Sequence, residues 1–98
     1  MQLIISPDAR KDLSDIWDYI AVSSVDAVDA LYDEFLRQFE LFVAMPDMGK
    51  RQDELSVNLR SFPWGRYLTF YRVEGDELTI VRVLHGARDI PTAFGGIH

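Results

Sequence analysis

The chain has 98 residues, 48% of them hydrophobic, and a formal net charge of −6 at pH 7, so we expect one folded domain over residues 1–98. The absence of cysteine excludes disulfides and thiolate metal sites, and the acidic balance argues against direct, specific nucleic-acid binding by this chain alone. No apolar run reaches the roughly 20 residues that span a bilayer. The N-terminus also lacks the basic and apolar regions of a signal peptide, so we expect a cytoplasmic protein without membrane contact.

The first half of the chain predicts a strand followed by two helices. Gln2–Ile5 is short and apolar, which is typical of a strand. Ser6 and Pro7 are a helix start, and apolar residues at helical spacing predict a helix over Pro7–Val22. A second helix is predicted over Val25–Ala44, with Ser24 as its N-cap. Because the link between the helices is so short, they should form an antiparallel hairpin.

The second half predicts a small sheet. A polar loop covers residues 46–56, and strands are predicted over Val57–Phe62, Arg66–Val73 and Glu77–His85. Pro63-Trp64-Gly65 is predicted to be a turn or a bulge. The order β-α-α-β-β-β indicates an α+β fold with the helical hairpin packed on one face of a mostly antiparallel sheet. Residues 91–98 should form a loose tail.

Basic residues concentrate in the second half. Residues 1–49 hold ten Asp or Glu and three Lys or Arg, whereas residues 50–98 hold six and seven. This asymmetry predicts a local cationic surface on an acidic protein. The arginines of the strand region recur along the predicted sheet: Arg60, Arg66, Arg72, Arg82 and Arg88.

Three of these arginines, together with Trp64, are candidates for binding a target. We expect Arg60 and Arg88, at strand ends, to be exposed. Strand alternation places Arg82 in an apolar row with Leu78, Ile80 and Leu84, as a snorkelling residue or as a charge kept for a partner. Trp64 is either an exposed anchor or a ring packed over the sheet end. The many aspartates at helical spacing should lie on solvated faces, and no spacing indicates a metal site.

His85 is the one histidine within the predicted fold. At a strand end it is either a structural residue or a general acid or base, since imidazole titrates near neutral pH. For RNA cleavage it would need cations beside it, and Arg60, Arg82 and Arg88 could supply that charge.

Short motifs also follow one another along nearly the whole chain: Ser6-Pro7 before the first helix, then Pro46-Asp47-Met48-Gly49, Leu59-Arg60, Tyr67–Val73 and Ile80–Asp89. In this order and at these spacings, residues 3–90 resemble the ParE toxins of the RelE/ParE superfamily of type II toxin–antitoxin systems. The resemblance implies a toxin that binds DNA gyrase, stabilises cleaved DNA complexes and works without turnover or a cofactor. It also implies a hetero-oligomer with a ParD-like antitoxin whose C-terminal segment wraps the toxin.

Three alternatives remain open. The first is a ribosome-dependent mRNA endonuclease of the RelE branch, which is disfavoured because the chain has only two lysines and no tyrosine after Tyr71. The second is a non-toxic, complex-forming or DNA-recognition accessory protein. The third is a family member that has lost its target.

Overall fold

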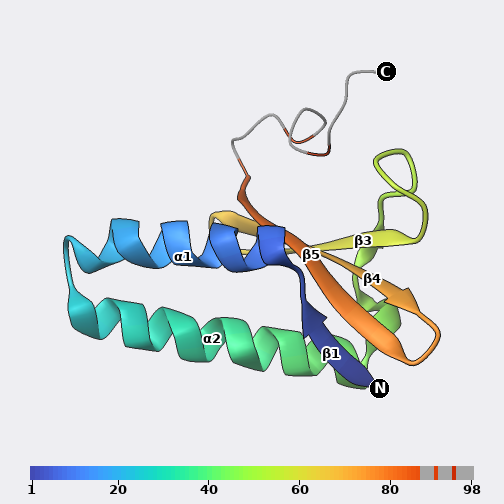
Figure 1. The fold of residues 1–98 in the computed structure, drawn as a ribbon, viewed down its shortest axis with the longest axis horizontal. Helices are drawn as coiled ribbons and strands as arrows, with labels where there is room; N and C mark the ends of the chain where they lie inside the picture. The colour runs from blue at the N-terminus through green and yellow to red at the C-terminus, as the bar shows by residue number, and fades with distance from the viewer. Residues whose placement is uncertain (87–89, 91–93, 95–98) are drawn as a thin grey trace.

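The computed structural model describes residues 1–86, 90 and 94. Within these residues the chain forms a five-stranded sheet in the order β1-β5-β4-β3-β2, against which the two helices pack (Figure 1). β1 lies parallel to β5, and the other neighbouring strands are antiparallel, as predicted. The elements are β1 (Gln2–Ile5), α1 (Pro7–Ala21), α2 (Val25–Ala44), a 3-10 turn η1 (Pro46–Met48), β2 (Lys50–Arg51), β3 (Leu59–Trp64), β4 (Tyr67–Glu74) and β5 (Glu77–His85).

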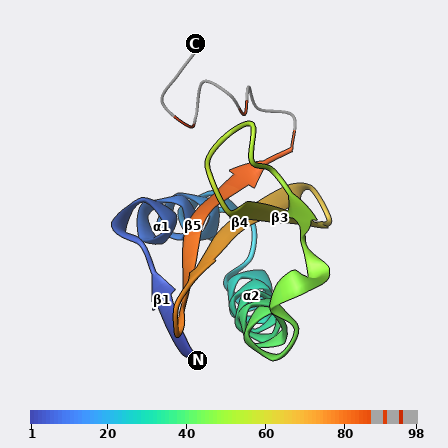
Figure 2. The same ribbon diagram turned by 90° about the vertical axis from the view of Figure 1, so that its right-hand side faces the viewer.

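Both helices begin at the residues that the sequence predicts. The Ser6 hydroxyl accepts a hydrogen bond from the amide of Ala9 at 3.0 Å, and Pro7 occupies the first turn. The same hydroxyl donates to the carbonyl of Val81 at 2.9 Å, so it fixes the start of α1 against β5. Figure 2 views the hairpin along its length and shows α1 beside β5. Ser24 caps α2 in the same way, accepting from the amide of Ala27 at 3.2 Å.

The main core lies between the helices and the sheet. Its buried residues are Ala9, Leu13, Phe35, Phe39, Phe42, Tyr71, Leu78, Ile80 and Val83. A smaller cluster on the other side of the sheet centres on Leu59, Phe70 and Leu84. The distal half of the hairpin extends beyond the sheet (Figure 1), so its apolar residues Trp17, Ile20 and Leu31 are only half-buried. Tyr19, Val22, Val25 and Tyr32 are largely exposed there.

Two predicted boundaries are wrong in the same region. Pro63 and Trp64 continue β3 instead of forming a turn, and Val57 and Asn58 precede the strand. Proline is tolerated because β2 pairs only with Arg60 and Ser61, which leaves the outer edge of β3 beyond them unpaired among the described residues. The turn comes one residue later, at Gly65, whose φ of 57° suits glycine.

A bulge in β5 overturns the predicted row for Arg82. Phe70 pairs with Arg82 and Tyr71 pairs with Ile80, so Val81 has no direct partner on β4. The extra residue breaks the period-2 alternation. Ile80 therefore belongs to the main core, whereas Leu84 belongs to the smaller cluster on the other side of the sheet.

Candidate functional site

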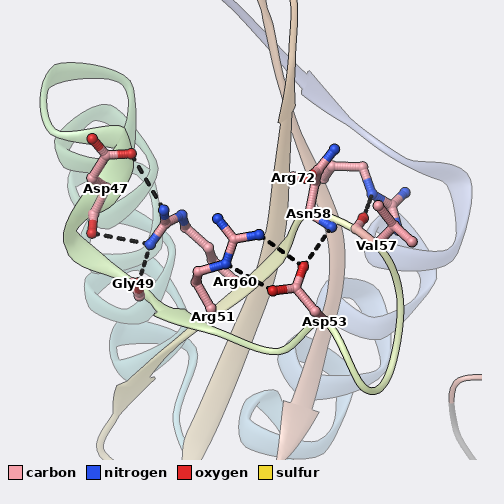
Figure 3. Close-up of polar contacts among 8 residues, drawn as sticks. All are labelled: Asp47, Gly49, Arg51, Asp53, Val57, Asn58, Arg60 and Arg72. Atoms are coloured by element: carbon pink, nitrogen blue, oxygen red, sulfur yellow. Dashed lines mark hydrogen bonds and ion pairs between the residues drawn. The ribbon is translucent and has the colours of Figure 1, made fainter.

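Arg60 is mostly buried and holds a loop, contrary to the expectation that it would be exposed. Its side chain is 20% exposed. Its guanidinium donates to the carbonyl oxygens of Gly49, at 2.8 Å, and Asp47, at 3.3 Å (Figure 3). The Asp47 carboxylate lies 3.4 Å away but is itself 96% exposed, so it contributes little. Arg60 therefore ties the loop between α2 and β2 to the sheet.

Tyr71 on β4 also binds this loop. Its hydroxyl donates to the carbonyl of Pro46 at 2.8 Å and accepts from the amide of Gly49 at 2.8 Å. A Cβ on Gly49 would lie 2.6 Å from that hydroxyl oxygen, which explains why glycine stands here. The Pro46-Asp47-Met48-Gly49 motif is thus a structural clasp fastened by Arg60 and Tyr71.

Arg51 and Arg72 lie on the same side of this clasp and are also engaged (Figure 3). Arg51 lies across the strand pair from Arg60 and binds both carboxylate oxygens of Asp53, at 2.7 and 3.0 Å. The hydrogen bond from Arg51 is the main reason that the pKa of Asp53 lies below its ordinary 3.8. Arg72 donates to the carbonyl of Val57 at 3.1 Å and also binds the Ser56 hydroxyl. Each of the three arginines here, Arg51, Arg60 and Arg72, therefore has a local acceptor.

Arg82 forms an ion pair that the sequence did not reveal. Its guanidinium binds both carboxylate oxygens of Asp12, at 2.7 and 2.9 Å. Asp12 was expected on a solvated helix face, yet it is only 8% exposed. The hydrogen bond with Asp12 raises the pKa of Arg82 above its ordinary value, although burial opposes the shift. Arg60 thus contacts the loop before β2 and Arg82 contacts the helix after β1, so they do not form one cationic cluster.

The remaining predicted residues lie at the end of the sheet near the β3–β4 turn. Trp64 is half-buried against Phe35, with ring centroids 5.1 Å apart and an edge-to-face angle of 65°. His85 is exposed, and its ring stands edge-on to Tyr67 at 6.0 Å. Arg88 lies outside the described residues.

An open pocket beside His85 contains residues that the sequence analysis did not single out. It has a volume of about 320 Å³ and is lined by Asp15, Ile16, Tyr19, Arg66, Tyr67 and His85. The residues come from α1, the β3–β4 turn and the ends of β4 and β5. The only signal in the sequence was Arg66 among the recurring arginines, because residues 15–19 and 66–67 meet only through the fold.

A second pocket, of about 230 Å³, forms an apolar groove between the helices. It is lined by Ile5, Arg10, Leu13, Trp17, Tyr32, Phe35, Leu36 and Phe39. The rings of Trp17 and Tyr32 pack at 5.1 Å. The Nε1–H group of Trp17 is buried and has no acceptor among the described residues, which is unusual for a buried donor.

The described residues contain neither a membrane-spanning helix nor a cluster of metal-ligating side chains. Neither helix in that part of the chain is both long and apolar enough to cross a bilayer. Those residues also contain no cluster of three or more His, Cys, Asp or Glu that could hold a metal ion.

Comparisons with known proteins agree in sequence and in fold. A family model described as the ParE toxin of the type II toxin–antitoxin system parDE matches residues 3–90. Toxin ParE1 of Mycobacterium tuberculosis H37Rv is 32% identical over 89 residues, covering 89% of this chain and 91% of that protein. Toxin ParE1 of Caulobacter vibrioides is 33% identical over 92 residues, covering 93% and 95%. A solved chain from the chromosomal ParDE TA system of P. aeruginosa shares the fold, with a TM-score of 0.71 at 19% identity, covering 87% of this chain and 95% of that chain.

Proposed function

This chain belongs to the ParE toxin family of type II toxin–antitoxin systems, and on that premise we propose that it arrests growth by binding DNA gyrase and is neutralised by a ParD-like antitoxin. Toxicity would come from contact that stabilises cleaved DNA complexes, without turnover. The family supplies the premise, and the solved ParDE system with the same fold fits an antitoxin partner.

The observation that carries the antitoxin proposal is the groove between α1 and α2. Two large aromatic side chains of the groove are not fully covered by the rest of the protein. Trp17 is half-buried, and Tyr32 is 45% exposed. Apolar side chains of a peptide placed in the groove would cover both rings. We propose that an amphipathic helix of the antitoxin binds here, and that an extended segment pairs with the uncovered edge of β3.

Charge around the hairpin sets the character of that helix. Exposed aspartates surround the distal apolar residues: Asp15, Asp18, Asp26, Asp29 and Asp33. A partner helix with basic residues flanking its apolar face would complement them, which speeds association and excludes acidic competitors.

A matched pair of α2 substitutions tests the groove. Tyr32→Glu places a charge in the groove and should weaken antitoxin binding at least roughly tenfold. Ala30→Glu is the control, because Ala30 is exposed on the same helix and lines neither the groove nor the pocket beside β3. Equal affinities of the two variants for the antitoxin would contradict the proposal.

Tryptophan fluorescence gives a direct readout of the same contact. The chain has two tryptophans. In a Trp64→Phe background Trp17 is the only emitter, and its emission should change when a tryptophan-free antitoxin is titrated in. An unchanged spectrum at saturation would place the antitoxin elsewhere.

The target is tested by two parallel assays with purified toxin. One adds the toxin to gyrase with supercoiled plasmid, and the other adds it to translating ribosomes with mRNA. We expect cleaved plasmid complexes in the first assay and intact mRNA in the second. Specific mRNA cuts with unaffected gyrase would overturn the proposal.

One observation favours the endonuclease as a second candidate. His85 lies in an open pocket with Arg66 and Tyr67, which brings a titratable group, a cation and a hydroxyl together. Sequence analysis assigned Arg60, Arg82 and Arg88 to that chemistry; of these, Arg60 is engaged by the loop clasp and Arg82 by Asp12, and Arg88 lies outside the described residues. The gyrase proposal therefore ranks first.

A further inference from the structure

Arg66 differs from the other arginines that the structure describes. Each of the others donates to a carboxylate or to a backbone carbonyl: Arg10, Arg37, Arg51, Arg60, Arg72 and Arg82. The guanidinium of Arg66 has no hydrogen bond or ion pair with any described residue, and the residue is exposed. Its backbone, in contrast, is fixed: the carbonyl of Arg66 accepts from the amide of Gly86 at 2.8 Å. Arg66 thus combines a fixed backbone with a guanidinium that no described residue binds.

The surroundings of Arg66 are those of a binding site. Tyr19 and Tyr67 line the same pocket, and neither hydroxyl is hydrogen-bonded to another described residue. Tyr19 is 79% exposed, which is extreme for an aromatic side chain on a helix. The Tyr67 ring packs edge-to-face with Phe35, at 5.9 Å, and with His85, at 6.0 Å. Tyrosine and arginine on a rigid frame are the residues that dominate the free energy of protein–protein binding.

We propose that this pocket is the toxin's target-binding site and that it holds an Asp or Glu side chain from the surface of the target protein. The proposal rests on the proposed function, since DNA gyrase is the target named there. The planar guanidinium of Arg66 binds a carboxylate through two parallel hydrogen bonds. Tyr67 contributes a third donor, and the Tyr19 ring covers the contact from solvent.

The charge around the pocket favours a protein carboxylate over a nucleic-acid backbone. Asp15 lines the pocket, and Asp18 is exposed on the next turn of α1. The Asp15 carboxylate forms an ion pair with Lys11 at 2.9 Å. Because both side chains are well exposed, this pair neutralises the negative charge of Asp15 only in part. A polyphosphate would bring several negative charges against these aspartates, whereas a single carboxylate brings one.

A pair of charge reversals tests the site. Arg66→Glu should weaken growth arrest and gyrase inhibition roughly 10- to 30-fold or more. Lys50→Glu is the matched control, because Lys50 is the other exposed basic side chain without a partner among the described residues and lies on the far edge strand β2. It should change both readouts less than about twofold. Both variants should retain the circular dichroism spectrum and the antitoxin affinity of the parent.

Two conservative variants separate binding from charge alone. Arg66→Lys keeps the charge but loses the two-pronged geometry, so we expect an intermediate loss of growth arrest. Tyr67→Phe removes one hydroxyl and should weaken gyrase inhibition about three- to tenfold.

Several outcomes overturn the inference. If Arg66→Glu arrests growth as well as Lys50→Glu does, the pocket does not bind the target. Loss of antitoxin affinity in Arg66→Glu would assign the pocket to the antitoxin. If Arg66→Glu weakens binding to a DNA oligonucleotide without gyrase as much as it weakens gyrase inhibition, the pocket binds phosphate. If the parent arrests growth without affecting gyrase, the proposed function fails, while the growth comparison still decides the pocket.

Discussion

Asp12 on α1 and Arg82 on β5 form a two-pronged ion pair across 70 residues of sequence, with oxygen–nitrogen distances of 2.7 and 2.9 Å. The same carboxylate accepts a hydrogen bond from the amide of Val83 at 3.0 Å. β1 ends its pairing at Ile80, so beyond that point the edge of β5 has no strand neighbour among the described residues. Asp12 takes the place of that neighbour and fastens α1 to the sheet.

Asp12→Ala should therefore lower the free energy of unfolding by about 3 kcal/mol, because it removes the carboxylate that binds the mostly buried Arg82 guanidinium through two hydrogen bonds. Asp18→Ala, on the exposed side of the same helix, should change it by less than about 0.5 kcal/mol. Urea denaturation followed by circular dichroism measures both. Similar midpoints for the two variants would show that the ion pair is not important for stability.

Gly49→Ala should lower the free energy of unfolding by roughly 1–3 kcal/mol, since the new methyl group would displace the Tyr71 hydroxyl from its two backbone partners. Gly86→Ala is the control, because its Cβ would meet only the Arg66 carbonyl at 3.4 Å. Thermal unfolding of the two variants should differ clearly. A Gly49→Ala protein as stable as Gly86→Ala would refute the clasp.

The stability of the parent should fall at alkaline pH through Tyr71. Burial raises the pKa of its hydroxyl above the ordinary 10.0. The unfolded chain then loses this proton at a lower pH than the folded protein, so the stabilisation is complete below about pH 10 and is lost as pH rises through the folded pKa. Between about pH 9 and about pH 11 the parent should lose more unfolding free energy than Tyr71→Phe does. Parallel pH profiles would contradict this.

Arg88 remains a candidate target contact from the sequence. Arg88→Glu should abolish growth arrest while leaving the fold and the antitoxin affinity largely intact, because the sequence predicts an exposed residue and surface substitutions usually cost within about 0.5 kcal/mol. Arg37→Glu serves as the control, because the Arg37 side chain on α2 is 70% exposed. Growth assays with and without antitoxin decide it: an Arg88→Glu toxin that still arrests growth would remove this residue from the target site.

His85→Gln distinguishes contact from catalysis. Glutamine still donates and accepts hydrogen bonds, so growth arrest should weaken by no more than a few-fold if the toxin acts by binding. A ribonuclease would lose roughly 10²–10⁴-fold in cleavage, because a general acid or base must titrate. A folded His85→Gln protein without activity, together with mRNA cuts by the parent, would make the endonuclease the leading function.

Local patterns in the sequence were enough for both helices and for four of the five strands, whereas β2 lies where a polar loop was predicted. Ser6-Pro7 and Ser24 define the helix starts because capping depends only on neighbouring residues. The turn at Gly75 needs a positive φ, which glycine supplies without help from the rest of the fold. The motifs that identify the family could be read in the same way, since their spacing is a property of the chain.

Only the tertiary structure decided what the charged residues do. A helical period places Asp12 on a polar face but cannot show that this face meets the open edge of β5. The predicted row for Arg82 failed because a single bulge shifts every later side chain. The sequence predicts Arg60 as an exposed cation, but in the fold the loop before β2 covers it and accepts its hydrogen bonds. Arg66 carries the same charge, yet among the described residues it alone of the arginines stays unpaired. That difference depends on contacts between segments far apart in the sequence, which no local pattern encodes.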